Sequence, residues 1–119
     1  SAWHNVQKSG DFNPCHTHTH FEDRFISPDI STVGYIKLPQ SMSEYKHTKP
    51  HHSVGGYIEF VEGTEDIFTN SNYLLQPILK DFYLFPASLR HAVYPFHSDN
   101  ETDERISFSF NAKIVFDEK

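Results

Sequence analysis

The feature that most constrains the fold is a succession of short runs rich in Phe, Tyr, Ile and Val, each closed by Pro, Gly or another turn-forming residue. These residue types favour strands, and no run keeps a helical period for three turns. About seven or eight strands are therefore predicted. They lie near residues 2–7, 12–20, 30–38, 56–62, 74–79, 82–85, 91–94 and 105–116. Many short strands without helices are typical of a sandwich or barrel, and we expect an all-β jelly roll.

Length and composition narrow the class of protein. A chain of 119 residues suits one domain, and Trp3 resembles a mid-strand residue, so the natural chain is expected to begin before residue 1. The net charge of −6 does not favour a nucleic-acid partner. The single Cys15 cannot form an internal disulfide, and no apolar run approaches about 20 residues. These observations predict a cytoplasmic protein without a membrane span or signal peptide.

Histidines alternate along one predicted strand. His16, His18 and His20 occupy every second position, and alternate positions of an extended chain point to the same face. Two imidazoles from this strand can therefore reach one transition-metal ion. His91, at the start of a late apolar strand, is a candidate third ligand, because early and late strands lie side by side in a jelly roll. The alternative reading is a solvated histidine cluster with no metal.

Arg105 and Ser107 alternate in the same way on the last strand, with Ile106 and Phe108 facing the other side. A guanidinium binds a carboxylate through a planar fork of two donors, and a hydroxyl two residues away can donate to the same group. The alternative reading is an exposed strand arginine paired with a nearby acid such as Asp103 or Glu104.

Five blocks, in this order, carry a resemblance to a known family. They are Asn13-Pro14-x-His16-x-His18, Ser31-x-x-x-Tyr35-Ile36-Lys37-Leu38-Pro39, Gly56-Tyr57-Ile58-Glu59-Phe60, Leu84-Phe85-Pro86 followed by His91, and Glu104-Arg105-Ile106-Ser107-Phe108-Ser109-Phe110-Asn111. The set resembles the bacterial and phage branch of the 2-oxoglutarate/Fe(II) oxygenases, which is distantly similar to prolyl 4-hydroxylases. The resemblance covers residues 3–116 and implies a double-stranded β-helix.

The same resemblance implies the cofactors Fe(II) and 2-oxoglutarate and a role for individual residues. By position, the metal ligands would be His16, His18 and His91, and the residues at 2-oxoglutarate would be Arg105, Ser107 and Tyr35. Arg105 and Ser107 match the positions that bind the distal carboxylate, and Tyr35 matches a strand position that faces the cosubstrate.

The first metal motif departs from the common pattern. Most such oxygenases use two histidines and one carboxylate, with Asp two residues after the first histidine. Here that position is His18, which predicts a site of three histidines. The alternative is a His-x-Glu motif at His20 and Glu22. The first register is preferred because Asn13-Pro14 aligns the motif on His16.

The function that the resemblance implies is a dioxygenase that hydroxylates an unidentified substrate and forms succinate and CO2. A peptidyl substrate is suggested by analogy alone, and selectivity is expected in the loop at residues 40–55. Two rival functions are a cupin-like metal or small-ligand binding module and a structural jelly roll without turnover. Arg105 discriminates between them, because a metal-binding barrel needs no carboxylate clamp beside the ion.

Overall fold

The structure, a computed structural model, describes residues 2–19, 27–40 and 55–117. Eight strands are present in these ranges and no helix is. The strands are β1 (Ala2–Lys8), β2 (Asn13–His16), β3 (Ile30–Lys37), β4 (Ile58–Val61), β5 (Asn72–Leu75), β6 (Phe82–Pro86), β7 (Arg90–Val93) and β8 (Glu104–Ala112). The described ranges therefore hold no helix that could cross a lipid bilayer.

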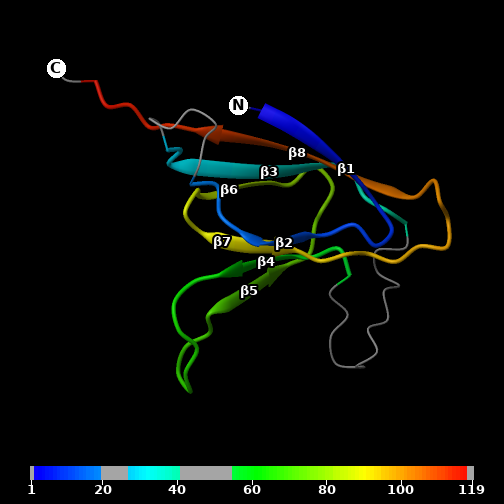
Figure 1. The fold of residues 1–119 in the computed structure, drawn as a ribbon, viewed down its shortest axis with the longest axis horizontal. Helices are drawn as coiled ribbons and strands as arrows, with labels where there is room; N and C mark the ends of the chain where they lie inside the picture. Colours follow the sequence, from blue (N-terminus) through cyan, green and yellow to red (C-terminus); the bar gives the residue numbers. More distant parts are fainter. Residues whose placement is uncertain (1, 20–26, 41–54, 118–119) are drawn as a thin grey trace.

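The strands form two antiparallel four-stranded sheets that lie one over the other (Figure 1). One sheet has the order β1-β8-β3-β6 and the other β2-β7-β4-β5. Each sheet thus places early strands beside late ones, which is the arrangement of a jelly roll. The predicted all-β, double-stranded β-helix is confirmed. The pairing of β2 with β7 brings His16 directly opposite His91.

The space between the sheets is only partly apolar. A small core of Ile58, Phe60 and Phe85 packs there. The buried polar side chains of the described residues are Gln7, Ser31, Thr32, Glu59, Ser71, His91, Arg105, Ser107 and Ser109. Every fully buried side-chain nitrogen and oxygen among the described residues has a hydrogen-bond partner, as a stable interior requires. This interior therefore combines an apolar core with a polar chamber.

Strand β8 turns its polar side chains inward. Arg105 and Ser107 are buried, whereas Phe108 on the alternate face is 37% exposed, so the predicted alternation is confirmed. On the outer face, the rings of Phe82 and Phe108 stack across Gly34 of β3. A Cβ at Gly34 would collide with both rings, so glycine allows this aromatic contact.

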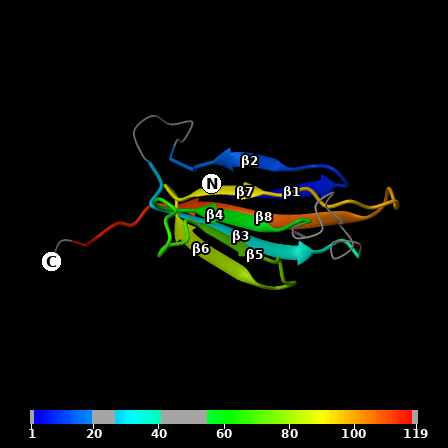
Figure 2. The same cartoon turned by 90° about the horizontal axis from the view of Figure 1, so that it is seen from below.

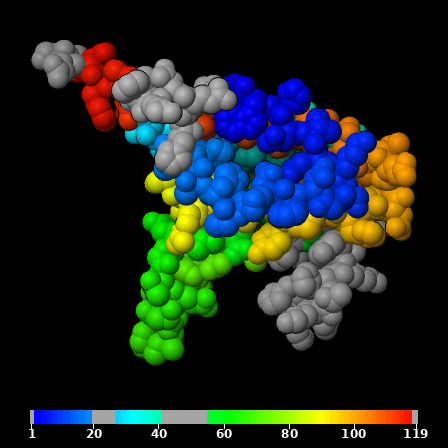
Figure 3. Space-filling model, in the orientation of Figure 1, coloured from blue at the N-terminus to red at the C-terminus, as the bar shows by residue number. Residues whose placement is uncertain are grey.

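Three predicted strands end well before their expected last residue, and the first of them, predicted at residues 12–20, ends at His16. The run at residues 105–116 leaves the sheet at Ala112, because its partner strands begin there, with Ala2 opposite Phe110 and Ile30 opposite Ala112. The following residues extend away from the sheets (Figures 2 and 3). The run at residues 74–79 also differs. Strand β5 begins two residues earlier and ends at Leu75, where its pairing with the first residue of β4 ends.

Candidate metal and cosubstrate site

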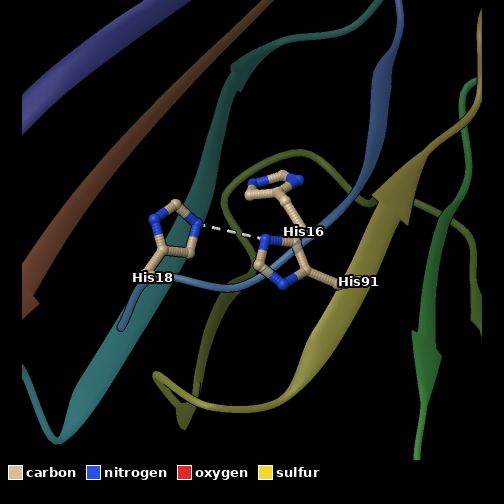
Figure 4. A group of neighbouring side chains, drawn as sticks. All are labelled: His16, His18 and His91. Atoms are coloured by element: carbon tan, nitrogen blue, oxygen red, sulfur yellow. Dashed lines mark hydrogen bonds between the residues drawn. The ribbon is translucent and has the colours of Figure 1, made fainter. Parts of the chain in front are cut away.

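Three histidines from two neighbouring segments of the chain converge on one point (Figure 4). His16 ends β2, His18 lies in the extended segment that follows, and His91 lies in β7. The Nε2 atoms of His18 and His91 are 3.1 Å apart, and one ligand atom from each histidine lies within 4.8 Å of the others. The backbone amide of His18 donates to the carbonyl of Ala87 (2.9 Å), which holds this segment against the β6–β7 turn.

Backbone carbonyls orient two of the rings. Nδ1 of His16 lies 2.6 Å from the carbonyl oxygen of Pro14, and Nδ1 of His91 lies 3.0 Å from that of Leu89. A carbonyl only accepts, so each Nδ1 carries a proton and each Nε2 is the ring nitrogen that remains for a metal. A histidine that donates one ring N–H to a carbonyl is the usual arrangement of a metal ligand.

Burial keeps the imidazoles of His18 and His91 neutral. Desolvation lowers the pKa of His91 to about 4; the carbonyl of Leu89 opposes this shift, and the charges of His16 and His18 add to it. The pKa of His18 is also lowered, first by burial and then by His16. At neutral pH, His18 and His91 are therefore in the uncharged form that binds metals.

The cluster fits a transition-metal ion. Two imidazole nitrogens bound to one ion at about 2.1 Å and at right angles lie about 3 Å apart, which is close to the separation of the His18 and His91 Nε2 atoms. Imidazole suits iron among other metals. The cluster found among the described residues contains three imidazoles and no carboxylate. His20 and Glu22, the alternative motif, lie outside the described residues.

Arg105 is buried and forms no salt bridge among the described residues. Its side chain is 1% exposed, and it donates to Oε1 of Gln7 and to the carbonyl of Gly56. The guanidinium also lies over the ring of Phe96, 5.9 Å from the centroid. Burial lowers its pKa, while Tyr35 and Asp11 act in the opposite direction. An arginine remains charged even so, which makes this chamber attractive to an anion.

The alternative reading of Arg105 as an exposed, acid-paired residue is not what the structure shows. Glu104 lies on the other face of β8, where its carboxylate pairs with Lys37 at 3.0 Å. The hydroxyl of Ser98 donates to Asp103, and so does the backbone amide of Gln40. Neither acid is among the hydrogen-bond partners of Arg105.

Ser107 and Tyr35 lie beside Arg105. They face each other across the β3–β8 pair, and both are buried. Burial raises the pKa of Tyr35 to about 12, although the charge of Arg105 opposes the shift. The phenol therefore stays protonated at neutral pH and can donate to an anion.

One cavity is lined both by the three histidines and by Arg105 with its neighbours Ser107 and Tyr35. It has a volume of about 300 Å³, and all six residues singled out by the sequence line it. Gln7 also lines it, and sequence reasoning missed this residue; Asn13, which served only to align the metal motif, lines it as well. The only local signal for Gln7 was its alternation with Trp3 and Asn5 on the first strand, because its partner is far away in the sequence.

The sequence matches a known protein family. The family described as "Putative 2OG-Fe(II) oxygenase" matches residues 1–111. The chain belongs to this oxygenase family. A search among curated proteins gives no match. Membership implies Fe(II) and 2-oxoglutarate as cofactors, and the cluster of three histidines is a candidate metal site for such an enzyme.

A solved structure shares the fold of this oxygenase. It is the crystal structure of a Pseudomonas putida prolyl-4-hydroxylase, with a TM-score of 0.60 and 18% sequence identity. The match covers 94% of this chain and 50% of that chain, so the chain spans half the length of the hydroxylase. At this identity the likeness shows the fold alone.

The choice between the two metal motifs can be tested by mutation. If His16 and His18 bind the ion, His20→Ala and Glu22→Ala should change Fe(II) affinity by less than about tenfold, the lower limit for losing an outer-shell partner. His18→Ala is the matched control and should reduce affinity strongly. Anaerobic calorimetric titration measures all three. Loss of binding in Glu22→Ala together with normal binding in His18→Ala would establish the His-x-Glu register instead.

Proposed function

We propose that this oxygenase binds Fe(II) through His16, His18 and His91, and 2-oxoglutarate through Arg105 with its neighbours, and that it hydroxylates a C–H bond of its substrate. One observation carries the proposal. A buried guanidinium that forms no salt bridge among the described residues lines the same cavity as three converging imidazoles. A cation site and an anion site in one small chamber suit a dicarboxylate that also contacts a metal.

Arg105 would hold the distal carboxylate of 2-oxoglutarate. Burying a charge without a counterion is costly, and an anion that enters the chamber offsets this cost. The planar guanidinium matches the geometry of a carboxylate, and the hydroxyls of Ser107 and Tyr35 are further donors on adjacent strands. Together they would orient the cosubstrate with its other end toward the histidines.

The apolar residues that line the cavity would exclude water from the reaction. Val33, Ile58, Phe85 and Val93 line the cavity beside the polar residues. Apolar walls exclude water and strengthen the electrostatic contacts inside. When bound, iron and 2-oxoglutarate would supply the oxidative chemistry together with O2: one oxygen atom of O2 would go into the succinate formed with CO2 from 2-oxoglutarate, and the other into the hydroxyl group of the substrate. The protein contributes geometry and a protected site.

For the substrate we propose only a chemical class. The hydroxylase that shares the fold is named for prolyl residues, so a peptidyl side chain is the class that this neighbour favours. Residues 41–54, where selectivity is expected, lie outside the described residues. The rival function, a metal-binding barrel without turnover, leaves the buried Arg105 without a role.

An anaerobic titration tests the function. Addition of 2-oxoglutarate to the protein loaded with Fe(II) is expected to produce the visible absorbance band of the iron chelate, and admission of oxygen is expected to yield succinate. The same protein without iron is the control and should show neither signal. If the band is absent at millimolar 2-oxoglutarate, a metal-binding barrel becomes the better account.

A further inference from the structure

We infer that Gln7 is a positioning residue, which presents Arg105 to a carboxylate and, being neutral, reserves the charge of Arg105 for that ligand. The inference rests on the proposed function of Arg105. Gln7 lies on β1 directly opposite Arg105 on β8. It is 8% exposed and lines the same cavity as the three histidines.

Gln7 occupies the edge of the guanidinium formed by Nε and Nη2, and a backbone carbonyl binds the third nitrogen. Oε1 of Gln7 accepts from Nε (3.1 Å) and from Nη2 (2.7 Å) of Arg105, and the carbonyl of Gly56 accepts from Nη1 (2.7 Å). A guanidinium has five N–H donors. The three bonds leave one N–H on each terminal nitrogen. Those two donors can meet both oxygens of one carboxylate.

The orientation of the Gln7 amide is dictated by its neighbours. Arg105 only donates, so Oε1 must face it, and the Nε2 group then faces Oδ1 of Asn13 at 3.4 Å. A flipped amide would place its NH2 group against the guanidinium. Arg105 is thereby held from β1, while the carbonyl of Gly56 holds it from the start of the segment that leads into β4.

The neutrality of Gln7 matters as much as its geometry. An amide oxygen satisfies two donors of the buried guanidinium without neutralising its charge. A carboxylate at the same position would form a buried ion pair with Arg105. This pair would stabilise the ligand-free fold but lower the affinity of the site for an anionic ligand. A glutamine is therefore suited to a site that must stay empty until its ligand arrives.

Gln7→Glu tests this inference because it keeps the shape and adds the charge. The melting temperature of the ligand-free protein should rise, while affinity for 2-oxoglutarate should fall about 10- to 100-fold, the range for losing a hydrogen bond between charged groups. Fe(II) affinity should stay unchanged. Thermal unfolding without metal and anaerobic titration of the chelate band measure these effects. A merely structural residue would not move stability and ligand affinity in opposite directions.

A double-mutant cycle supplies the second measurement. Gln7→Met should weaken 2-oxoglutarate binding in the wild type but have little further effect in an Arg105→Lys background, where the planar fork is already lost. Val6→Thr is the matched control on the same strand. Val6 is 48% exposed on the opposite face, so this change should leave the affinity unaltered.

These measurements distinguish a failure of the proposed function from a failure of the positioning role of Gln7. Absence of 2-oxoglutarate binding by the wild type would overturn the proposed function, and this inference with it. If the wild type binds 2-oxoglutarate, equal affinity in Gln7→Glu, or an equal loss from Gln7→Met in both backgrounds, would overturn the positioning role alone and leave Arg105 as the carboxylate site.

Discussion

Replacing His91 by Ala is expected to reduce Fe(II) affinity by more than about 100-fold, the upper end of what losing an outer-shell partner costs. His91 is 4% exposed, and its Nε2 lies 3.1 Å from that of His18, so it stands at the centre of the proposed site. The substitution retains the backbone pairing of β7 with β2 and β4, and the domain should stay folded. Anaerobic calorimetric titration of the folded variant measures the affinity.

His97→Ala is the control for the effect of His91. This histidine is also near the C-terminal end of the chain, but its side chain is 67% exposed and it lies beside Asp99, away from the cluster. Its removal should leave Fe(II) affinity unaltered. Circular dichroism of both variants checks that each remains folded. An unchanged affinity in folded His91→Ala would eliminate His91 as a ligand.

Replacing Arg105 by Lys is expected to weaken 2-oxoglutarate binding by roughly 1–3 kcal/mol, the scale of a charge-assisted hydrogen bond. Lysine keeps the positive charge but loses the planar fork, and it cannot bond to both Gln7 and the carbonyl of Gly56 in the same way. Fe(II) affinity should barely change, because Arg105 is not a member of the histidine cluster. Titration of the chelate band under anaerobic conditions measures the two affinities separately.

Arg90→Lys provides a matched control for the Arg105 variant. Arg90 is an exposed arginine at the start of β7 and does not line the cavity. The same chemical change there should leave 2-oxoglutarate affinity as in the wild type. Equal affinity in Arg105→Lys and wild type would show that the fork is not the carboxylate site.

The strands could largely be predicted from the sequence because alternation and β-branched or aromatic residues are local signals. The run predicted at residues 30–38 is close to β3, Ile30–Lys37. Strand ends were less predictable. Residues after Ala112 include the apolar run Ile114-Val115-Phe116 but leave the sheet where the neighbouring strands begin. The length of a partner strand is not a local property.

Alternation also shows that Arg105 and Ser107 share a face, but not which face lines the interior. On β8, the buried face is the polar one, and Phe108 is turned outward. On β1, Gln7 is buried and Val6 is exposed. These orientations depend on which side of each strand meets the second sheet, and they make the chamber polar.

By itself, the sequence determined that the chain forms short strands, that His16 and His18 point to one side, and that the last strand carries a candidate anion site. Only the tertiary structure decided which distant residues meet. Pairing of β2 with β7 places His16 opposite His91, and pairing of β1 with β8 places Gln7 opposite Arg105. Local periodicity sets the direction of a side chain within its own strand, whereas the choice of partner strand is made when the whole barrel closes.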